Sequence, residues 1–305
     1  MMYIFYRVMA FLVRRLPRKG AYWIGLRICD LMYYLNPHGR RSVRNHMRII
    51  FEHQDIVPSR RVLDGYTRKT FQAFGKYLAD FIRYKHLTPE GVRETVSIQG
   101  LKYLEAIRDS DHGAILLTAH YGNWEMGGAI IAAMDIPINA VVRPVESPSL
   151  ERIFSMFRRQ RGLKVIPLAH AGVGILKALK RGEVVALVGD RDFTGNGQPA
   201  HFFGREVSLP RGAAWFSHRT GIPVTMGFVT RAPDDTFILR IHPPIDPVAA
   251  GSEGAIQAHI IRIMEETIAR DPSQWFIFDP FWPDEAETDE SPKRGSPEGF
   301  APPKT

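Results

Sequence analysis

The sequence predicts an α/β protein with a mostly parallel central sheet flanked by helices and an N-terminal helical segment that associates with a membrane. Three observations carry this prediction. From residue 114 onward, apolar runs of strand length alternate with segments of helical length, which is typical of a parallel sheet covered by helices. Before residue 88 the apolar residues recur at helical spacing. The composition, 45% hydrophobic and 24% charged, is that of a globular protein.

The chain divides into three parts in this interpretation. Residues 1–87 are expected to form helices that break near 17–20 and 36–39, with amphipathic helices over 40–51 and 62–84. Residues 88–283 are expected to form the α/β domain. Residues 284–305 are rich in Asp, Glu, Ser, Pro, Gly and Lys, so they cannot bury enough apolar surface to offset the entropy of ordering and should be disordered.

Within residues 88–283 the elements follow from the apolar pattern. The expected strands cover 96–98, 114–118, 139–142, 164–166, 184–188, 224–230 and 237–241. The expected helices cover 101–109, 124–134, 149–161, 172–180, 211–220 and 255–269.

Basic charge is concentrated at the N-terminus. Residues 1–48 carry ten Arg and Lys against one acid, Asp30, a net +9, whereas the whole chain is +8. Aromatic and apolar residues interleave with these arginines, which is typical of an element lying in a membrane interface. No apolar run approaches the roughly 20 residues of a spanning helix. Two alternatives stay open: a core helix with a solvated basic face, and nucleic-acid binding, although no recognised nucleic-acid module is present.

The stretch after the strand 114–118 holds the candidate chemistry. His120 stands at the carboxyl end of this strand, where ligands bind in open α/β sheets. Gly122 permits a sharp turn, Asn123 can cap the next helix, and Glu125 lies in its first turn. If the turn brings them together, Glu125 accepts one imidazole proton and leaves the other nitrogen free as a base. The motif holds no nucleophile of its own, which suits a substrate that brings a hydroxyl. The alternative is a structural histidine.

The order of several motifs resembles a known family. His-x4-Glu after an apolar strand resembles the His-x4-Asp/Glu motif of glycerolipid and lysophospholipid acyltransferases. More closely, the chain resembles the lipid A biosynthesis acyltransferases, the lauroyl/myristoyl transferases of Gram-negative bacteria, over about residues 5–282. The motifs that carry this resemblance are His120-Tyr-Gly-Asn-Trp-Glu125, Val142-Arg143-Pro144, Arg158, Lys180-Arg-Gly-Glu-Val-Val185, Gly189-Asp190-Arg-Asp192, Phe202-Phe-Gly204 and Pro272-Ser-Gln-Trp275.

The resemblance implies roles for single residues. His120 and Glu125 would be catalytic. Arg158 would be functionally important, although the adjacent Arg159 leaves this assignment open by one residue. Arg143 ends a strand and suits a phosphate or carboxylate, the alternative being a surface ion pair.

Further residues are assigned to substrate binding on the same basis. Asp190 and Asp192 are expected to fix Arg158 or Arg143 rather than to bind a metal. Phe203 and Gly204 would belong to a substrate-channel loop, and Asn123 to the site. The alternative for the Phe203 loop is an apolar anchor.

The function implied is a membrane-associated acyltransferase without metal or cofactor. It would move a fatty acyl group from a thioester of acyl carrier protein or coenzyme A to a lipid hydroxyl, at the cytoplasmic face of the bacterial inner membrane. A lipid A-type glycolipid is the expected acceptor. Asp279-Pro280 stands where the lipid A enzymes carry His-Arg-Arg-Phe, so another lysophospholipid or glycolipid stays open. An esterase, which lacks a Gly-x-Ser-x-Gly motif here, and a non-catalytic membrane-binding protein are the other classes.

Overall fold

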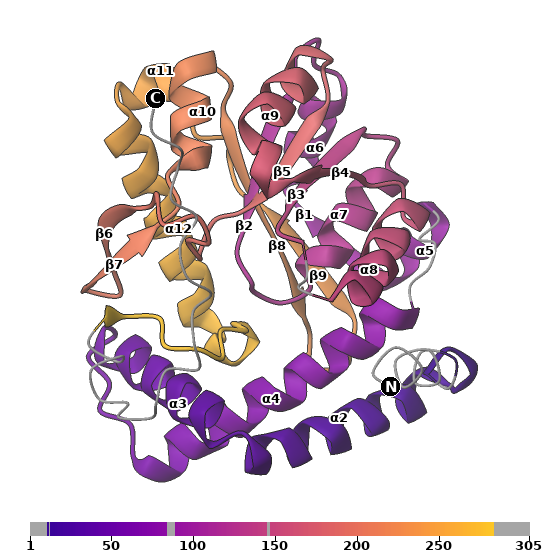
Figure 1. Ribbon diagram of the computed structural model, residues 1–305, viewed down its shortest axis with the longest axis vertical. Coiled ribbons are helices and arrows are strands. Elements are labelled where there is room, and N and C mark those ends of the chain that lie inside the picture. Colours follow the sequence, from indigo (N-terminus) through magenta and orange to yellow (C-terminus); the bar gives the residue numbers. More distant parts are fainter. Residues whose placement is uncertain (1–10, 12, 84–88, 145–146, 284–305) are drawn as a thin grey trace, which may run out of the picture.

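A seven-stranded sheet forms the centre of the computed structural model, which describes residues 11, 13–83, 89–144 and 147–283 (Figure 1). The strand order is β1-β9-β8-β2-β5-β3-β4. Every neighbouring pair is parallel except β8 and β9, which are antiparallel. The strands are β1 (Val96–Gln99), β2 (Ala114–Thr118), β3 (Ile138–Val142), β4 (Lys164–Pro167), β5 (Val184–Val188), β8 (Val224–Arg231) and β9 (Phe237–Ile241). The expected fold class is therefore confirmed.

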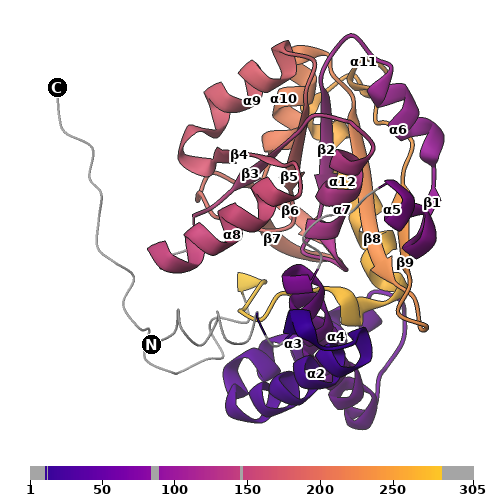
Figure 2. The same ribbon diagram turned by 90° about the vertical axis from the view of Figure 1, so that its right-hand side faces the viewer.

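Helices cover both faces of this sheet (Figures 1 and 2). One core cluster joins a face of the sheet to α9, α10 and α12, and a second joins the other face to α5, α6 and α7. The helices of this part are α5 (Pro89–Thr95), α6 (Leu101–Arg108), α7 (Trp124–Ala133), α8 (Pro148–Gln160), α9 (Ala171–Lys180), α10 (Gly212–Thr220), α11 (Pro247–Ala250) and α12 (Glu253–Arg270), with 3-10 turns at Leu168–His170 and Pro272–Gln274.

The N-terminal helices lie at the end of the sheet where β2 and β8 have their carboxyl ends, which is opposite to the carboxyl ends of β1 and β9. They are α2 (Arg18–Leu35), α3 (Pro37–Glu52) and α4 (Arg60–Arg83), at the bottom of both views (Figures 1 and 2). The axes of α2 and α4 can approach closely because a Cβ on Gly25 would lie 2.6 Å from the carbonyl oxygen of Gly75. Ile49 and Ile50 of α3 belong to the main core cluster, so this segment shares its core with the sheet.

One segment of the described structure differs from the expected organisation. A hairpin of β6 (Gln198–Phe202) and β7 (Arg205–Leu209) stands where the sequence pattern indicated only a loop. Among the described residues, no helix has the length and apolar character needed to cross a membrane. Residues 1–10 and the 284–305 tail lie outside the described part, and the division at residue 87 stays a prediction.

Candidate active site

His120 lies directly beyond the carboxyl end of β2, in a loop that three backbone hydrogen bonds hold. The carbonyl oxygen of His120 accepts from Phe276 N at 2.8 Å, and Gly122 N donates to the Gln274 carbonyl at 2.8 Å. Asn123 N donates to the carbonyl of a β8 residue at 2.7 Å. The loop is thus fixed from two sides, by the chain near 274–276 and by β8.

Gly122 is the position where this turn requires glycine. Its φ is +62°, in the left-handed region, and a Cβ there would lie 1.9 Å from the Val229 carbonyl oxygen. Asn123 caps α7 as expected, since its side chain accepts from Met126 N at 3.2 Å. The turn therefore places His120 on the strand end and starts the helix that carries Glu125.

Asp190, at the end of the adjacent strand β5, orients the imidazole. Its Oδ1 lies 2.8 Å from His120 Nδ1, and its Oδ2 accepts from the His120 backbone N and from Trp275 Nε1, each at 2.9 Å. Burial of this fully enclosed carboxyl raises its pKa, but the imidazole and these donors outweigh burial, so the pKa lies below its ordinary value. A carboxylate is an acceptor only, so Nδ1 carries the proton and Nε2 is left as a base.

Glu125 does not contact His120, and the sequence-based pairing was wrong. The carboxylate of Glu125 accepts instead from Arg158 of α8, with Oε1 at 3.0 Å from Nε and 2.6 Å from Nη2. Both side chains are nearly buried, 8% and 13% exposed. Glu125 sits in the first turn of α7, on the side facing α8, whereas the His120 ring turns toward β5. Arg158, rather than Arg159, is thus the arginine at the site.

The guanidinium of Arg158 keeps one nitrogen for a ligand. Burial lowers its pKa, and the charge of Glu125 more than offsets this, so the pKa lies above its ordinary value. Nη1 is buried and has no hydrogen-bond partner among the described residues, although Arg158 lines the cavity beside His120. A charged donor in such a place costs free energy unless a ligand pairs with it.

Asp190 and Asp192 do not fix Arg143 or Arg158, contrary to expectation. Asp192 shapes its own loop: its carboxylate accepts from the backbone N of Thr194 at 2.8 Å, Gly195 at 3.1 Å and Gly197 at 2.7 Å. Burial raises the pKa of Asp192, and these donors lower it further than burial raises it. No group of three or more His, Cys, Asp or Glu side chains in the described ranges is arranged to hold a metal ion.

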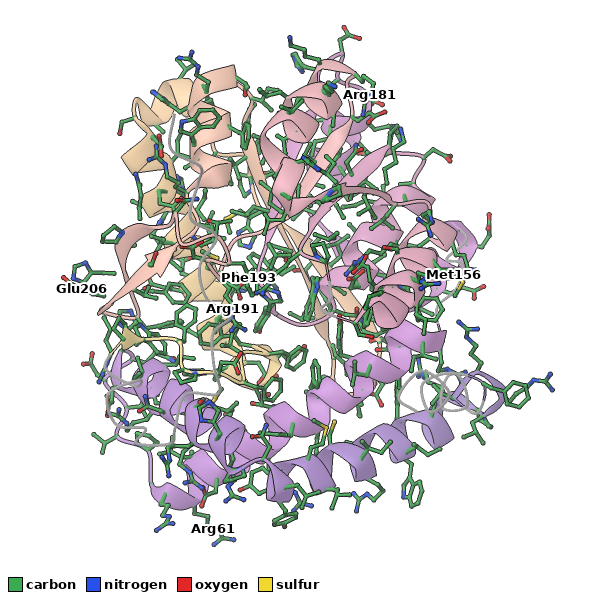
Figure 3. All side chains as sticks on the ribbon, viewed as in Figure 1. Arg61, Met156, Arg181, Arg191, Phe193 and Glu206 are labelled. Atoms are coloured by element: carbon green, nitrogen blue, oxygen red, sulfur yellow. The ribbon has the colours of Figure 1, made fainter. Side chains whose placement is uncertain are left out.

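The loop built by Asp192 presents Phe193 between two arginines at the mouth of the cavity. The Arg143 guanidinium lies 5.2 Å from the ring centroid of Phe193. The Arg191 guanidinium lies 5.0 Å from the same centroid, and Figure 3 labels both Arg191 and Phe193. Arg191 also donates to Asp279 at 2.7 Å, whereas Arg143 has no acidic partner among the residues that the structure describes. The Phe193 ring is 6.2 Å from the His120 ring. Sequence reasoning missed Arg191 and Phe193 as site residues.

Phe203 and Gly204 lie away from this site. They form the turn between β6 and β7, and neither lines the cavity beside His120. Phe203 is buried with φ +50°, its N–H donates to Glu265 at 2.5 Å, and its ring packs edge-on against His53 at 5.5 Å. The structure therefore favours the apolar-anchor alternative over a substrate-channel loop.

A cavity of about 990 Å³ opens beside His120 and runs between α7 and the sheet. Small residues keep it open: Gly127 and Gly128 on α7 face Ala140, Ala186 and Gly227 on three strands. The apolar part of the cavity wall also includes Leu116, Ile131, Ile138 and Leu163. Because apolar residues and glycines make up most of its lining and His120 is part of that lining, the cavity suits a long apolar ligand whose reactive end reaches the base.

Comparison with known proteins relates this chain to lipid acyltransferases. The model of the bacterial lipid A biosynthesis acyltransferase family matches residues 1–283. A phosphatidylinositol mannoside acyltransferase of Mycolicibacterium smegmatis is 25% identical over 282 residues, covering 89% of this chain and 88% of that one. The lipid A biosynthesis palmitoleoyltransferase of Escherichia coli K12 is 27% identical over 264 residues, covering 86% and 84%.

A solved structure, the 1-acyl-sn-glycerophosphate acyltransferase PlsC of Thermotoga maritima, aligns with 86% of this chain and all of that chain, at 13% identity and a TM-score of 0.40. The family match spans all but the last residues and includes every side chain of the His120 site. The chain belongs to the bacterial lipid A biosynthesis acyltransferase family.

Proposed function

We propose that this acyltransferase moves a fatty acyl group from a thioester to a sugar hydroxyl of a membrane glycolipid. The observation that carries the proposal is the His120–Asp190 pair beside a mostly apolar cavity, with no partner for Nε2 among the described residues. No Ser or Cys is among the described residues that line this cavity, and a base without such a nucleophile suits an activated acyl donor and an acceptor that brings its own hydroxyl. An esterase would have to give water the same access, and the apolar walls disfavour this.

In the proposed reaction His120 acts first as a base and then as an acid. His120 Nε2 takes the proton of the acceptor hydroxyl as its oxygen attacks the thioester carbonyl carbon. The C–O bond forms, the carbonyl becomes an oxyanion, and collapse breaks the C–S bond. The thiolate then takes the proton from His120, giving an ester and a free thiol. Asp190 stabilises the imidazolium that carries the proton between the two steps.

Arg158 Nη1 is the candidate donor for the oxyanion. The backbone N–H groups of Gly122 and Asn123, at the loop and helix start, already donate to carbonyl oxygens. The unpaired, buried Nη1 is left for developing negative charge. Glu125 keeps the guanidinium neutralised and in place between turnovers. The acyl chain would lie between α7 and the sheet, along Gly128 and Ala186.

The acceptor is proposed to be a glycolipid other than the bis-phosphorylated lipid A precursor. A clustered pair of phosphates is best met by several unpaired cations. At the mouth, Asp279 instead neutralises Arg191, which leaves Arg143 as the cation free of an acid among the described residues there. One phosphate and several sugar hydroxyls fit such a site better. A phosphatidylinositol mannoside, on which the Mycolicibacterium relative acts by its name, has this chemistry.

Membrane association is proposed through α2. Its outer face exposes large apolar side chains, including Trp23 at 63% and Leu35 at 72%, beside Lys19 and Arg27. An amphipathic helix with Trp and Leu on its apolar face and basic residues beside them binds anionic interfaces. The cytoplasmic face of the bacterial inner membrane would supply both this surface and acyl carrier protein or coenzyme A as the thioester carrier.

The test offers purified protein an acyl carrier protein thioester and three acceptors in parallel. They are a bis-phosphorylated glucosamine disaccharide lipid, a mannosylated phosphatidylinositol and a lysophospholipid. We expect ester formation with the mannosylated lipid, and none with His120→Ala. Transfer to the disaccharide lipid alone would refute the acceptor assignment. Full activity of His120→Ala would refute the mechanism.

A further inference from the structure

A buried carboxylate outside the cavity links the N-terminal helices to the loop that carries His120. Asp80 of α4 is 1% exposed. Its Oδ1 accepts from the Tyr22 hydroxyl of α2 at 2.7 Å, and its Oδ2 accepts from Asn123 Nδ2 at 3.3 Å and from Arg231 of β8. Asn123 caps α7 three residues after His120. One carboxylate thus joins α2, α4, β8 and the catalytic loop.

A second route leads from the same group to the same loop. The Arg231 guanidinium donates to the Tyr22 hydroxyl at 2.9 Å. The Arg231 backbone exchanges two hydrogen bonds with the Gln274 side chain, at 2.9 and 3.2 Å. The carbonyl oxygen of Gln274 accepts from Gly122 N at 2.8 Å. Gly122 and Asn123, the two residues of the turn after His120, are therefore both tied to one buried cluster.

Stability alone does not account for this cluster. A buried ion pair is often no more stabilising than apolar residues of the same volume, because desolvation offsets the attraction. Hydrogen bonds with fixed directions do, however, hold a backbone in one geometry. The partner that needs fixed geometry here is His120, whose Nδ1 must stay 2.8 Å from Asp190.

We infer that Asp80 is a positioning residue for acyl transfer, and that Tyr22, from an N-terminal helix, acts on His120 through it. The inference rests on the proposed function of His120. Loss of the Tyr22 hydroxyl removes one hydrogen bond from Asp80 and one from Arg231, which loosens the cluster that holds Asn123 and lets the His120 loop shift relative to Asp190.

The central experiment compares Tyr22→Phe with Tyr33→Phe. Tyr33 is also buried on α2, but its hydroxyl makes no hydrogen bond among the described residues, so it controls for the same chemical change. The Tyr22 hydroxyl donates to the Asp80 carboxylate and accepts from the Arg231 guanidinium. Because Asp80 and Arg231 stay paired without it, its loss in Tyr22→Phe should lower kcat by roughly 2- to 10-fold. The KM for the acceptor should stay at the wild-type value, and Tyr33→Phe should match wild type in both constants.

A second variant removes the link at the other end. Asn123→Ser keeps an oxygen that caps α7 but loses the donor to Asp80. Its kcat should fall by a similar factor. In the double variant with Tyr22→Phe the loss should be smaller than the product of the two, because both act on one network. Multiplicative losses would overturn the shared route.

A readout without acyl substrate separates this inference from the proposed function. The Nδ1–H resonance of His120 in ¹⁵N-labelled protein reports its hydrogen bond to Asp190. We expect it to shift in Tyr22→Phe and Asn123→Ser and to stay unchanged in Tyr33→Phe. An unchanged resonance and wild-type kcat in Tyr22→Phe, with only a lower Tm, would show that the cluster is merely structural. A shifted resonance in a protein without acyl transfer would refute only the proposed function.

Discussion

Replacing Asp190 by Asn is the sharpest test of how the base is oriented. The carboxylate of Asp190 takes three donors on two oxygens: His120 Nδ1, the His120 backbone N and Trp275 Nε1. An amide has a single oxygen. If that oxygen keeps the backbone and indole donors, its NH2 group faces Nδ1 and can only donate. The imidazole proton then moves to Nε2, and the base is lost.

The expected loss is large because the wrong tautomer cannot accept a proton. The corresponding change in the Ser-His-Asp template lowers kcat by about 10⁴, which corresponds to roughly 5 kcal/mol in the activation free energy. Acyl transfer from an acyl carrier protein thioester measures this directly. The unfolding Tm should stay near that of wild type, since two of the three hydrogen bonds to Asp190 survive in Asn.

Glu125→Gln is the matched control. It also turns a buried carboxylate into an amide, but it alters the Arg158 pair and leaves the His120 tautomer unchanged. We expect it to retain far more activity than Asp190→Asn. Its remaining loss should arise at the step in which Arg158 stabilises the oxyanion. A 10⁴-fold loss in Glu125→Gln together with a nearly active Asp190→Asn would refute the orientation by Asp190 and restore the pairing read from the sequence.

Two further predictions concern stability and membrane contact. Glu183 accepts hydrogen bonds from Arg181, the larger influence, and from Lys164, and these lower its pKa from 4.5 to about 2. The charged form of Glu183 therefore stabilises the fold above pH 4.5, and this contribution disappears as the pH falls to 2. Urea unfolding should show wild type losing on the order of 1 kcal/mol more than Glu183→Gln across that window, and equal losses would contradict this. Replacing Trp23 and Leu35 by Ser should reduce flotation with anionic vesicles, whereas undiminished flotation would place the contact elsewhere.

Local pattern in the sequence was enough to find most elements and the position of His120. The strand Ala114–Thr118 and the helix beginning at Trp124 follow from apolar runs and a glycine turn, and the structure has both. The hairpin Gln198–Leu209 was missed because a Gly-rich stretch precedes it, Pro199 lies in its first strand and the adjacent Phe202 and Phe203 interrupt its alternation.

The sequence pattern did not identify Asp190 as the partner of His120, because it does not give the order of the strands in the sheet. β5 follows β2 by some 70 residues in sequence, yet it is its direct neighbour in the sheet. A pattern of spacing shows that Asp190 ends a strand, but not which strand stands beside it. Glu125, five residues from His120, was the nearer carboxylate in sequence, and the turn at Gly122 directs it to the other side.

The two carboxylates of the site therefore have different roles: Asp190 orients His120, and Glu125 pairs with Arg158. An unpaired Arg158 in an apolar wall would cost several kcal/mol, because one removed partner leaves a buried charge uncompensated. Glu125 removes most of this cost by taking Nε and Nη2 while leaving Nη1 without a partner. If Glu125 were also the partner of His120, the guanidinium would lose its counter-charge whenever the imidazole became protonated. Placing the orienting charge on Asp190, just beyond the end of the neighbouring strand β5, lets the proposed base cycle through its charged form while the proposed oxyanion donor stays fixed.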